Sequence, residues 1–170
     1  KTAVKLYDNI RQSGIVAITL NEGDELVWGK VTTGKDNIML ITHDGKSIRF
    51  SETEVKSSQR DTKGVKGITL KPGDYVIGVE VFRDDPNVFK ENSLMIITEN
   101  GMGKRTLLEH YPLQKRSGLG VKVSEITKRT GKVAAAKLIS DRHDEIVIST
   151  KSGKAIKMPI SKKSIPTLTR

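Results

Sequence analysis

Short apolar segments separated by glycine turns recur along the chain. Each segment consists of Ile, Leu, Met, Val and hydroxyl residues and ends in threonine. The segments occupy residues 38–42, 94–98 and 146–150. A polar turn follows each one, ending at Gly45, Gly101 or Gly153, and a second segment with a basic residue comes next. Because β-branched residues favour strands, and Asp, Asn or Ser before glycine favours a tight turn with positive φ, this pattern predicts three β-hairpins.

A second pattern recurs between these hairpins. Residues 13–20 match residues 63–70 at an offset of 50 residues, and the match continues from Gly23-Asp24 to Gly73-Asp74. A weaker third copy begins near residue 119, where Gly131-Lys132 replaces the Gly-Asp pair. Helical periodicity is poor throughout, and the only helix we expect is one short turn within residues 104–111.

The repeats predict an all-β, propeller-like fold built from four-stranded blades of about 50 residues. We expect a single domain over residues 1–170. Its repeats comprise a partial one at 1–35, full ones at 36–90 and 91–143, and a partial one at 144–170. A closed propeller usually needs more blades, so we expect the native domain to be longer.

Composition narrows the class of partner. The chain has 30 Lys and Arg against 20 Asp and Glu, a formal net charge of +10, which favours an acidic polymer or surface. No apolar run approaches the roughly 20 residues of a membrane-spanning helix, and the first residues lack the apolar region of a signal peptide. Without cysteines, and with no metal-ligand spacing among its three histidines, the chain is expected to hold no metal or cofactor and to be cytoplasmic.

Basic residues recur in step with the repeats. Arg49, Arg105 and Lys157 each stand four residues after a turn glycine, and a second set lies in the glycine-bearing loops. The loop candidates are Arg11, Arg60, Lys63, Lys66, Lys115, Arg116 and Lys122, and the hairpin candidates include Lys46, Arg49, Lys104, Arg105, Lys154 and Lys157. Repeated cations suit phosphate contacts along a curved track, although any single one is equally well explained as solvated surface. Aromatic residues make up only 4%, which favours duplex DNA over stacked single strands.

Three motifs in order carry a family resemblance: RQSGIVAI at 11–18 followed by GDELV at 23–27, QRDTKGVKGI at 59–68 and ITENGMGKRT at 97–106. Over nearly all its length the chain resembles the C-terminal domain of the bacterial DNA gyrase A subunit. The resemblance implies a β-pinwheel, a propeller-like disc whose blades exchange strands with their neighbours. It also implies that a basic rim binds, bends and wraps double-stranded DNA without reading its sequence, which supports negative supercoiling.

The same resemblance implies partners and a division of labour. The partners are double-stranded DNA, the remainder of the gyrase A subunit, and through it the gyrase B subunit, with no membrane. The cleaving tyrosine and the ATPase lie elsewhere in the family, so we expect no catalytic residue here. The hallmark box of the family, Q-R-R-G-G-K-G, is not intact: residues 114–120 keep its Gln, basic pair and two glycines but have Leu119 in place of Lys.

Three other interpretations remain. The C-terminal domain that ends the equivalent subunit of topoisomerase IV shares the architecture and supports decatenation. A protein-interaction propeller fits the fold, but gives no reason for basic residues in each repeat. An enzyme is disfavoured because the phosphate-loop-like residues 101–106 have Arg105 where Ser or Thr is required after Lys104, and no nucleophile–base pair is evident.

Overall fold

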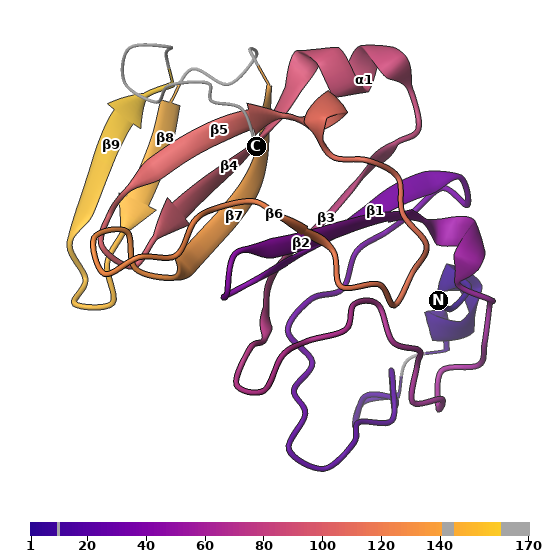
Figure 1. Cartoon of the computed structure of the whole chain (residues 1–170). Helices are drawn as coiled ribbons and strands as arrows, with labels where there is room; N and C mark the ends of the chain where they lie inside the picture. Colours follow the sequence, from indigo (N-terminus) through magenta and orange to yellow (C-terminus); the bar gives the residue numbers. More distant parts are fainter. Residues whose placement is uncertain (10, 141–144, 161–170) are drawn as a thin grey trace.

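The computed structural model describes residues 1–9, 11–140 and 145–160, and antiparallel sheets dominate it (Figure 1). The strands are β1 (Asp36–Thr42), β2 (Lys46–Ser51), β3 (Val76–Arg83), β4 (Asn92–Thr98), β5 (Gly103–Leu107), β6 (Val121–Lys122), β7 (Val133–Ser140), β8 (Glu145–Ser149) and β9 (Ala155–Pro159). In the described residues they form sheets in the orders β3-β1-β2-β6, β5-β4-β7 and β8-β9. The all-β prediction is confirmed.

The three predicted hairpins are present. They pair β1 with β2, β4 with β5 and β8 with β9, each in antiparallel register. Their turn glycines have the positive φ that the sequence pattern requires, at 75° for Gly45, 77° for Gly101 and 83° for Gly153. Local turn chemistry is therefore enough to place these strands.

Helical structure is limited to short turns in the part of the chain that the structure describes. The 3-10 turns are η1 (Val4–Tyr7), η2 (Glu52–Glu54) and η3 (Leu108–His110). The helical turn expected within 104–111 is η3, and β5 takes the residues before it. The short helix α1 (Pro86–Glu91) was not predicted from the sequence. It begins where the Asp85 carboxylate accepts a hydrogen bond from the Asn87 amide (2.8 Å) and a proline occupies the first turn.

Strand β6 joins the sheet of the preceding repeat. It lies between residues 91 and 143 in sequence, yet it pairs with β2, with Ser47 opposite Val121 and Lys46 opposite Lys122. Gly120 permits this approach, because a Cβ there would lie 2.3 Å from the Ser47 carbonyl oxygen. The strand exchange implied by the family resemblance is therefore present at this junction.

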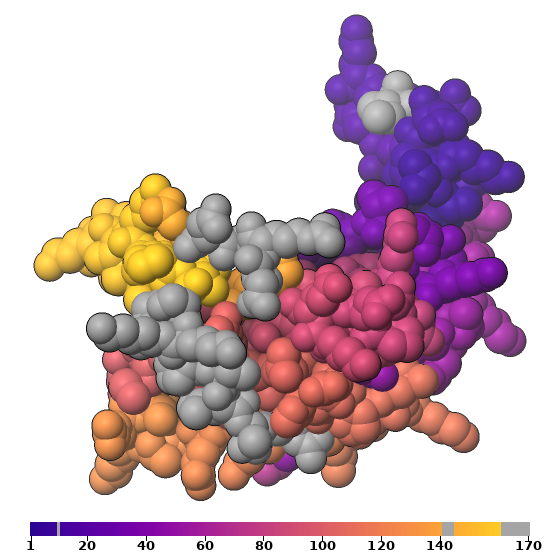
Figure 2. Space-filling view, turned by 90° about the horizontal axis from the view of Figure 1, so that it is seen from above, coloured from indigo at the N-terminus to yellow at the C-terminus, as the bar shows by residue number. Residues whose placement is uncertain are grey.

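The main hydrophobic core lies between the first two sheets. Met39 and Ile41 of β1 belong to one buried cluster with Leu94 and Ile96 of β4, and Tyr111 is buried in the same cluster. By contrast, the N-terminal residues run largely without strands below the sheets (Figure 1) and project to one side when the molecule is viewed from above (Figure 2). Burial of apolar area thus ties the two repeats into one body.

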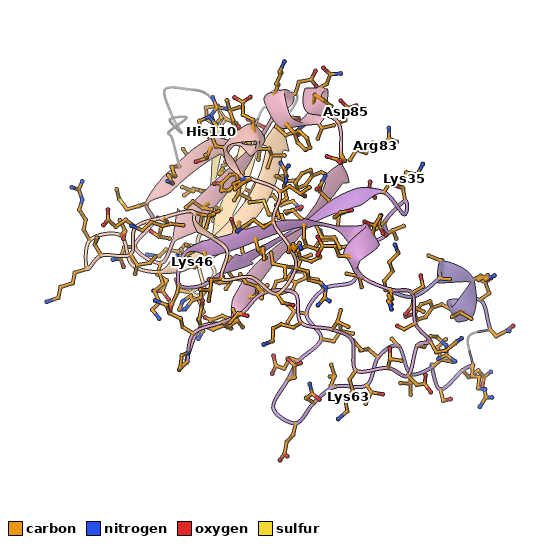
Figure 3. All side chains as sticks on the ribbon, turned by 45° about the vertical axis from the view of Figure 1, so that its right-hand side comes forward. Lys35, Lys46, Lys63, Arg83, Asp85 and His110 are labelled. Atoms are coloured by element: carbon orange, nitrogen blue, oxygen red, sulfur yellow. The ribbon has the colours of Figure 1, made fainter. Side chains whose placement is uncertain are left out.

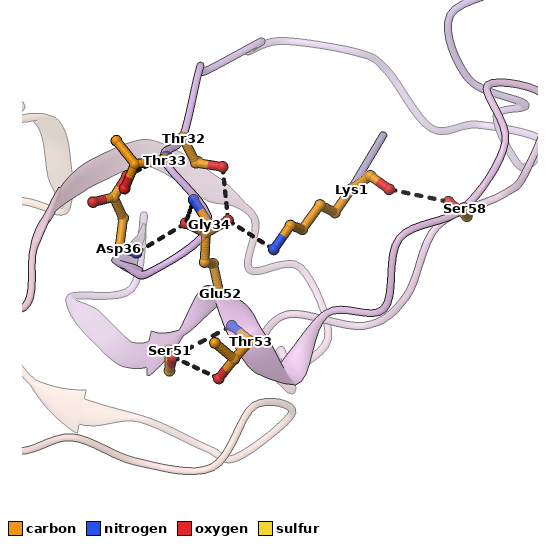
Figure 4. Close-up of polar contacts among 9 residues, drawn as sticks. All are labelled: Lys1, Thr32, Thr33, Gly34, Asp36, Ser51, Glu52, Thr53 and Ser58. Carbon is orange, nitrogen blue, oxygen red and sulfur yellow. Dashed lines mark hydrogen bonds and ion pairs between the residues drawn. The ribbon is translucent and has the colours of Figure 1, made fainter. Parts of the chain in front are cut away.

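Glu52 is a fully buried carboxylate that organises the entry to β1 (Figure 4). It accepts hydrogen bonds from the Gly34 amide (2.6 Å), the Asp36 amide (2.8 Å) and the Thr32 hydroxyl (2.7 Å). Lys1 Nζ lies 2.9 Å from its Oε2. Burial raises the pKa of this carboxyl, but the amide, hydroxyl and ammonium donors outweigh burial and lower the pKa to about 2.

We predict that acid weakens the fold through Glu52. The folded-state pKa lies below the ordinary value of 4.5, so the stabilisation is complete above pH 4.5 and disappears as the pH falls towards 2. The loss is on the order of 3 kcal/mol. Thermal melting between pH 2 and 6 measures it. Glu52→Gln should lower the melting temperature at pH 6 and flatten this pH dependence, whereas Glu22→Gln, at an exposed position, should leave both unchanged. An equally steep acid loss in Glu52→Gln contradicts the assignment.

Gly120 should tolerate substitution far less than another glycine of similar backbone geometry. Gly120 and Gly73 both have positive φ, 68° and 79°, but a Cβ at Gly73 meets nothing within 4 Å. We expect Gly73→Ala to cost about 1–2 kcal/mol from φ alone, and Gly120→Ala roughly 3 kcal/mol or more because β6 must move away from β2. Chemical denaturation of both variants measures the difference. Equal losses would mean that the close approach of β6 is not required for stability.

Candidate nucleic-acid interface

Three lysines from two repeats form a basic group, here called the lysine cluster: Lys46, Lys104 and Lys122. Lys46 and Lys122 are direct cross-strand partners in β2 and β6, an arrangement in which like charges repel. Burial lowers the pKa of Lys104 on β5, and the charge of Lys122 lowers it further. The fold therefore holds three cations close together, and a bound anion would relieve their repulsion.

Acidic side chains near the lysine cluster are mostly engaged elsewhere. Glu125 lies 3.8 Å from Lys122 Nζ, but both side chains are largely exposed, so this pair contributes little. Lys46 lines a cavity of about 320 Å³ with two carboxylates. One of these, Asp44, pairs with Lys132 at 2.7 Å, and the other, Asp74, accepts a hydrogen bond from the Asp44 amide at 2.9 Å. Positive charge remains in excess.

The cations four residues after each turn glycine share a register but not an environment. Arg49, Arg105 and Lys157 each lie opposite the second residue of the partner strand's apolar run. The Arg49 guanidinium is 4.6 Å from the centre of the Phe89 ring, and burial lowers its pKa. Lys157 is exposed and forms an ion pair with Glu145. Arg105 is only 6% exposed, so these positions do not form one exposed line.

The loop cations divide into two kinds. Arg60 and Arg116 are half-buried, and each donates a hydrogen bond from Nη1 to a backbone carbonyl of an earlier loop, that of Val16 or Lys66. The other candidates have exposed side chains: Arg11, Lys63, Lys66, Lys115 and, on the β8–β9 turn, Lys154. Lys46 and Lys63 come from different regions of the molecule (Figure 3). The structure thus offers the lysine cluster and a separate set of exposed loop lysines.

Two cations beside the lysine cluster were not among the sequence candidates. Lys71 and Lys132 line the same cavity as Lys46. The signal for Lys132 is its place after Gly131, where the other repeats have aspartate after the matching glycine. Contact with Asp44 raises the pKa of Lys132. The lysine that replaces aspartate in this repeat therefore forms an ion pair with an aspartate of the preceding repeat.

Other chemistry finds little support in the described residues. No group of three His, Asp or Glu side chains among them could hold a metal ion. None of the helices in residues 1–9, 11–140 and 145–160 is long and apolar enough to cross a membrane. The formal net charge of +10 remains the property of the chain that favours an anionic partner.

Comparisons with known proteins agree with this architecture. The family model described as "DNA gyrase C-terminal domain, beta-propeller" matches residues 1–33, 36–83, 92–140 and 144–162. The chain is 39% identical over 160 residues to the DNA gyrase A subunit of Dehalogenimonas lykanthroporepellens, covering 94% of this chain and 19% of that protein. It thus spans about a fifth of the length of such curated relatives.

Two solved structures are similar. The C-terminal domain of DNA topoisomerase IV has a TM-score of 0.87 and 26% identity, covering 99% of this chain and 50% of that chain. A DNA gyrase A C-terminal domain has a TM-score of 0.71 and 29% identity, covering 85% of this chain and 47% of that one.

The electrostatics of the lysine cluster are directly testable. In Lys122→Gln, we expect the pKa of Lys104 to rise towards its ordinary value, although burial should keep it below that value. Lys122→Arg retains the charge and should leave the pKa of Lys104 lowered. An NMR titration of the lysine side-chain carbons measures both. If the two variants give the same Lys104 pKa, these side chains do not interact.

Proposed function

The chain belongs to the DNA gyrase C-terminal domain, beta-propeller family, and from that premise we propose that it binds double-stranded DNA through the phosphate backbone without reading sequence. The observation that carries the proposal is the lysine cluster. Two lysines face each other across β2 and β6, and a third has its pKa lowered in part by the charge of one of them. A phosphate placed among them relieves their repulsion and favours the charged form of Lys104.

The exposed loop lysines offer further contact points, separate from the lysine cluster. Lys63, Lys66 and Lys115 come from two loops that follow each other in the repeat pattern and have exposed side chains. Duplex DNA presents charge continuously along its length, so cations at several separated points favour bending over contact at one point. We therefore propose that the bound duplex bends around this domain, with repeats at 36–90 and 91–143 contributing successive contacts.

In the whole protein, this binding would serve supercoiling by a gyrase. DNA held on the domain can be presented to the rest of the A subunit, and through it to the B subunit. We place DNA cleavage and ATP hydrolysis in those other parts, so this domain acts without a catalytic residue of its own. The cytoplasm, where bacterial chromosomal DNA lies, is the corresponding location.

A second candidate is the equivalent role in topoisomerase IV, namely decatenation. The solved C-terminal domain of that enzyme covers 99% of this chain at a TM-score of 0.87, against 85% and 0.71 for the gyrase domain. The two roles differ in wrapping. Ligation of nicked circular DNA with the chain bound separates them, because wrapping changes the linking number of the sealed circle and binding without wrapping does not.

A salt series tests phosphate binding. Affinity for duplexes of unrelated sequence should fall steeply with salt, with a log–log slope of about −0.9 for each phosphate neutralised. In the triple variant Lys46→Gln, Lys104→Gln and Lys122→Gln, the slope should decrease in magnitude by about 2.7 and the affinity should fall on every sequence. Fluorescence anisotropy with labelled duplexes measures both quantities.

The matched control removes the same charge elsewhere. Lys35, Lys90 and Lys128 are exposed and follow no repeat, so their triple substitution by Gln should lower affinity much less. Equal effects of the two triple variants would show that net charge alone governs binding. A salt-independent affinity, or no binding at low salt, would instead favour the protein-interaction propeller.

A further inference from the structure

The same hydrogen bonds join successive loops twice along the chain. The Thr19 amide donates to the Thr62 carbonyl (3.1 Å), and its hydroxyl donates to the Asp61 carbonyl (2.7 Å). In the next repeat, the Thr69 amide donates to the Gly118 carbonyl (2.9 Å), and its hydroxyl to the Ser117 carbonyl (2.7 Å). Each threonine therefore holds the loop of the following repeat by two adjacent carbonyls.

An arginine in each later loop donates a hydrogen bond in the reverse direction, to the earlier loop. Arg60 Nη1 donates to the Val16 carbonyl at 2.5 Å, and Arg116 Nη1 donates to the equivalent carbonyl of Lys66. Arg116 Nη1 also lies 3.1 Å from Ser117 Oγ. In both repeats, one nitrogen of the guanidinium is therefore engaged by a backbone carbonyl of the preceding loop.

The backbone at the second contact is held in an unfavourable conformation. Ser117 has φ 69° and is the one residue other than glycine with positive φ among those described. Its amide donates to the Gly67 carbonyl (2.8 Å) and its hydroxyl to the Lys66 carbonyl (3.0 Å). Such a conformation persists when surrounding contacts over-determine it, and strain of this kind is concentrated at functional sites.

We propose that Arg60 and Arg116 are positioning residues, which fix each basic loop on the preceding one so that Lys63, Lys66 and Lys115 meet phosphates at a set spacing. The inference rests on the proposed function and changes the role of two predicted DNA contacts. The neighbouring exposed lysines make the phosphate contacts, and the arginines act through them. Rigid presentation raises affinity because less side-chain and loop freedom is lost on binding.

Replacing arginine by lysine separates positioning from direct contact. Lysine keeps the charge and can neutralise a phosphate, but its ammonium lacks the rigid planar geometry with which the guanidinium directs Nη1 at the Lys66 carbonyl. In Arg116→Lys we expect the Thr69 and Ser117 amides to exchange with solvent at least tenfold faster, and duplex affinity to fall about threefold to tenfold. Arg83→Lys, at the exposed end of β3, is the matched control and should change neither.

Thr69→Val provides a second variant that changes no charge. It removes the hydroxyl donor to the Ser117 carbonyl and keeps the shape of the side chain. We expect the same pair of effects, faster exchange of the Ser117 amide and weaker duplex binding, in a chain whose circular dichroism and melting show that it is folded. Hydrogen exchange by NMR and fluorescence anisotropy are the two measurements.

Each alternative result has a distinct meaning. Wild-type affinity in Arg116→Lys, with or without faster exchange, overturns the positioning role and favours a direct contact or a purely structural one. Weaker binding with unchanged exchange overturns it as well. If the parent chain fails to bind duplex at low salt, the proposed function fails first, before any variant is compared, and the positioning role falls with it.

Discussion

The pairing of β6 with β2 is the constraint on which the arrangement of the two repeats depends. It places a strand of one repeat in the sheet of the preceding one, and it brings Lys122 opposite Lys46. The contact requires a residue without a side chain at Gly120, beside the Ser47 carbonyl. The same segment that joins the blades thus creates the like-charge pair proposed to bind phosphate, so the fold and this part of the lysine cluster depend on one contact.

Much of the fold could be predicted because it is encoded locally. Apolar runs ending before Gly45 and Gly101 specify hairpins through turn geometry, and both glycines have the expected positive φ. The exchange of β6 could not be deduced from its two residues, since nothing in Val121-Lys122 specifies its partner. It was implied by the family resemblance alone. The helix α1 is short enough that capping by Asp85, rather than periodicity, is its main signal.

The sequence predicted which cations are candidates for the site, but not how buried each one is or what it contacts. The residues predicted from the sequence included the cations of the lysine cluster and of the loops. The sequence could not show that Arg105 is buried, or that Arg49 packs on Phe89, because both depend on neighbours from other elements. Equivalent positions in a repeat share backbone register, while their surroundings diverge from one repeat to the next. Glu52 shows this clearly, since a buried carboxylate begins η2 where Leu108 begins η3.

The contacts between successive loops have a direction. The arginine always belongs to the later repeat and the carbonyl that it binds to the earlier one, as in Arg60 to Val16 and Arg116 to Lys66. A ribosome releases the earlier loop first, at about 5–20 residues per second. Because donor and acceptor are 44 or 50 residues apart, each earlier loop waits roughly 2–10 s of translation before the arginine that binds it has been synthesised. During synthesis these contacts can therefore form only in chain order, each one when the arginine of the later repeat has been made.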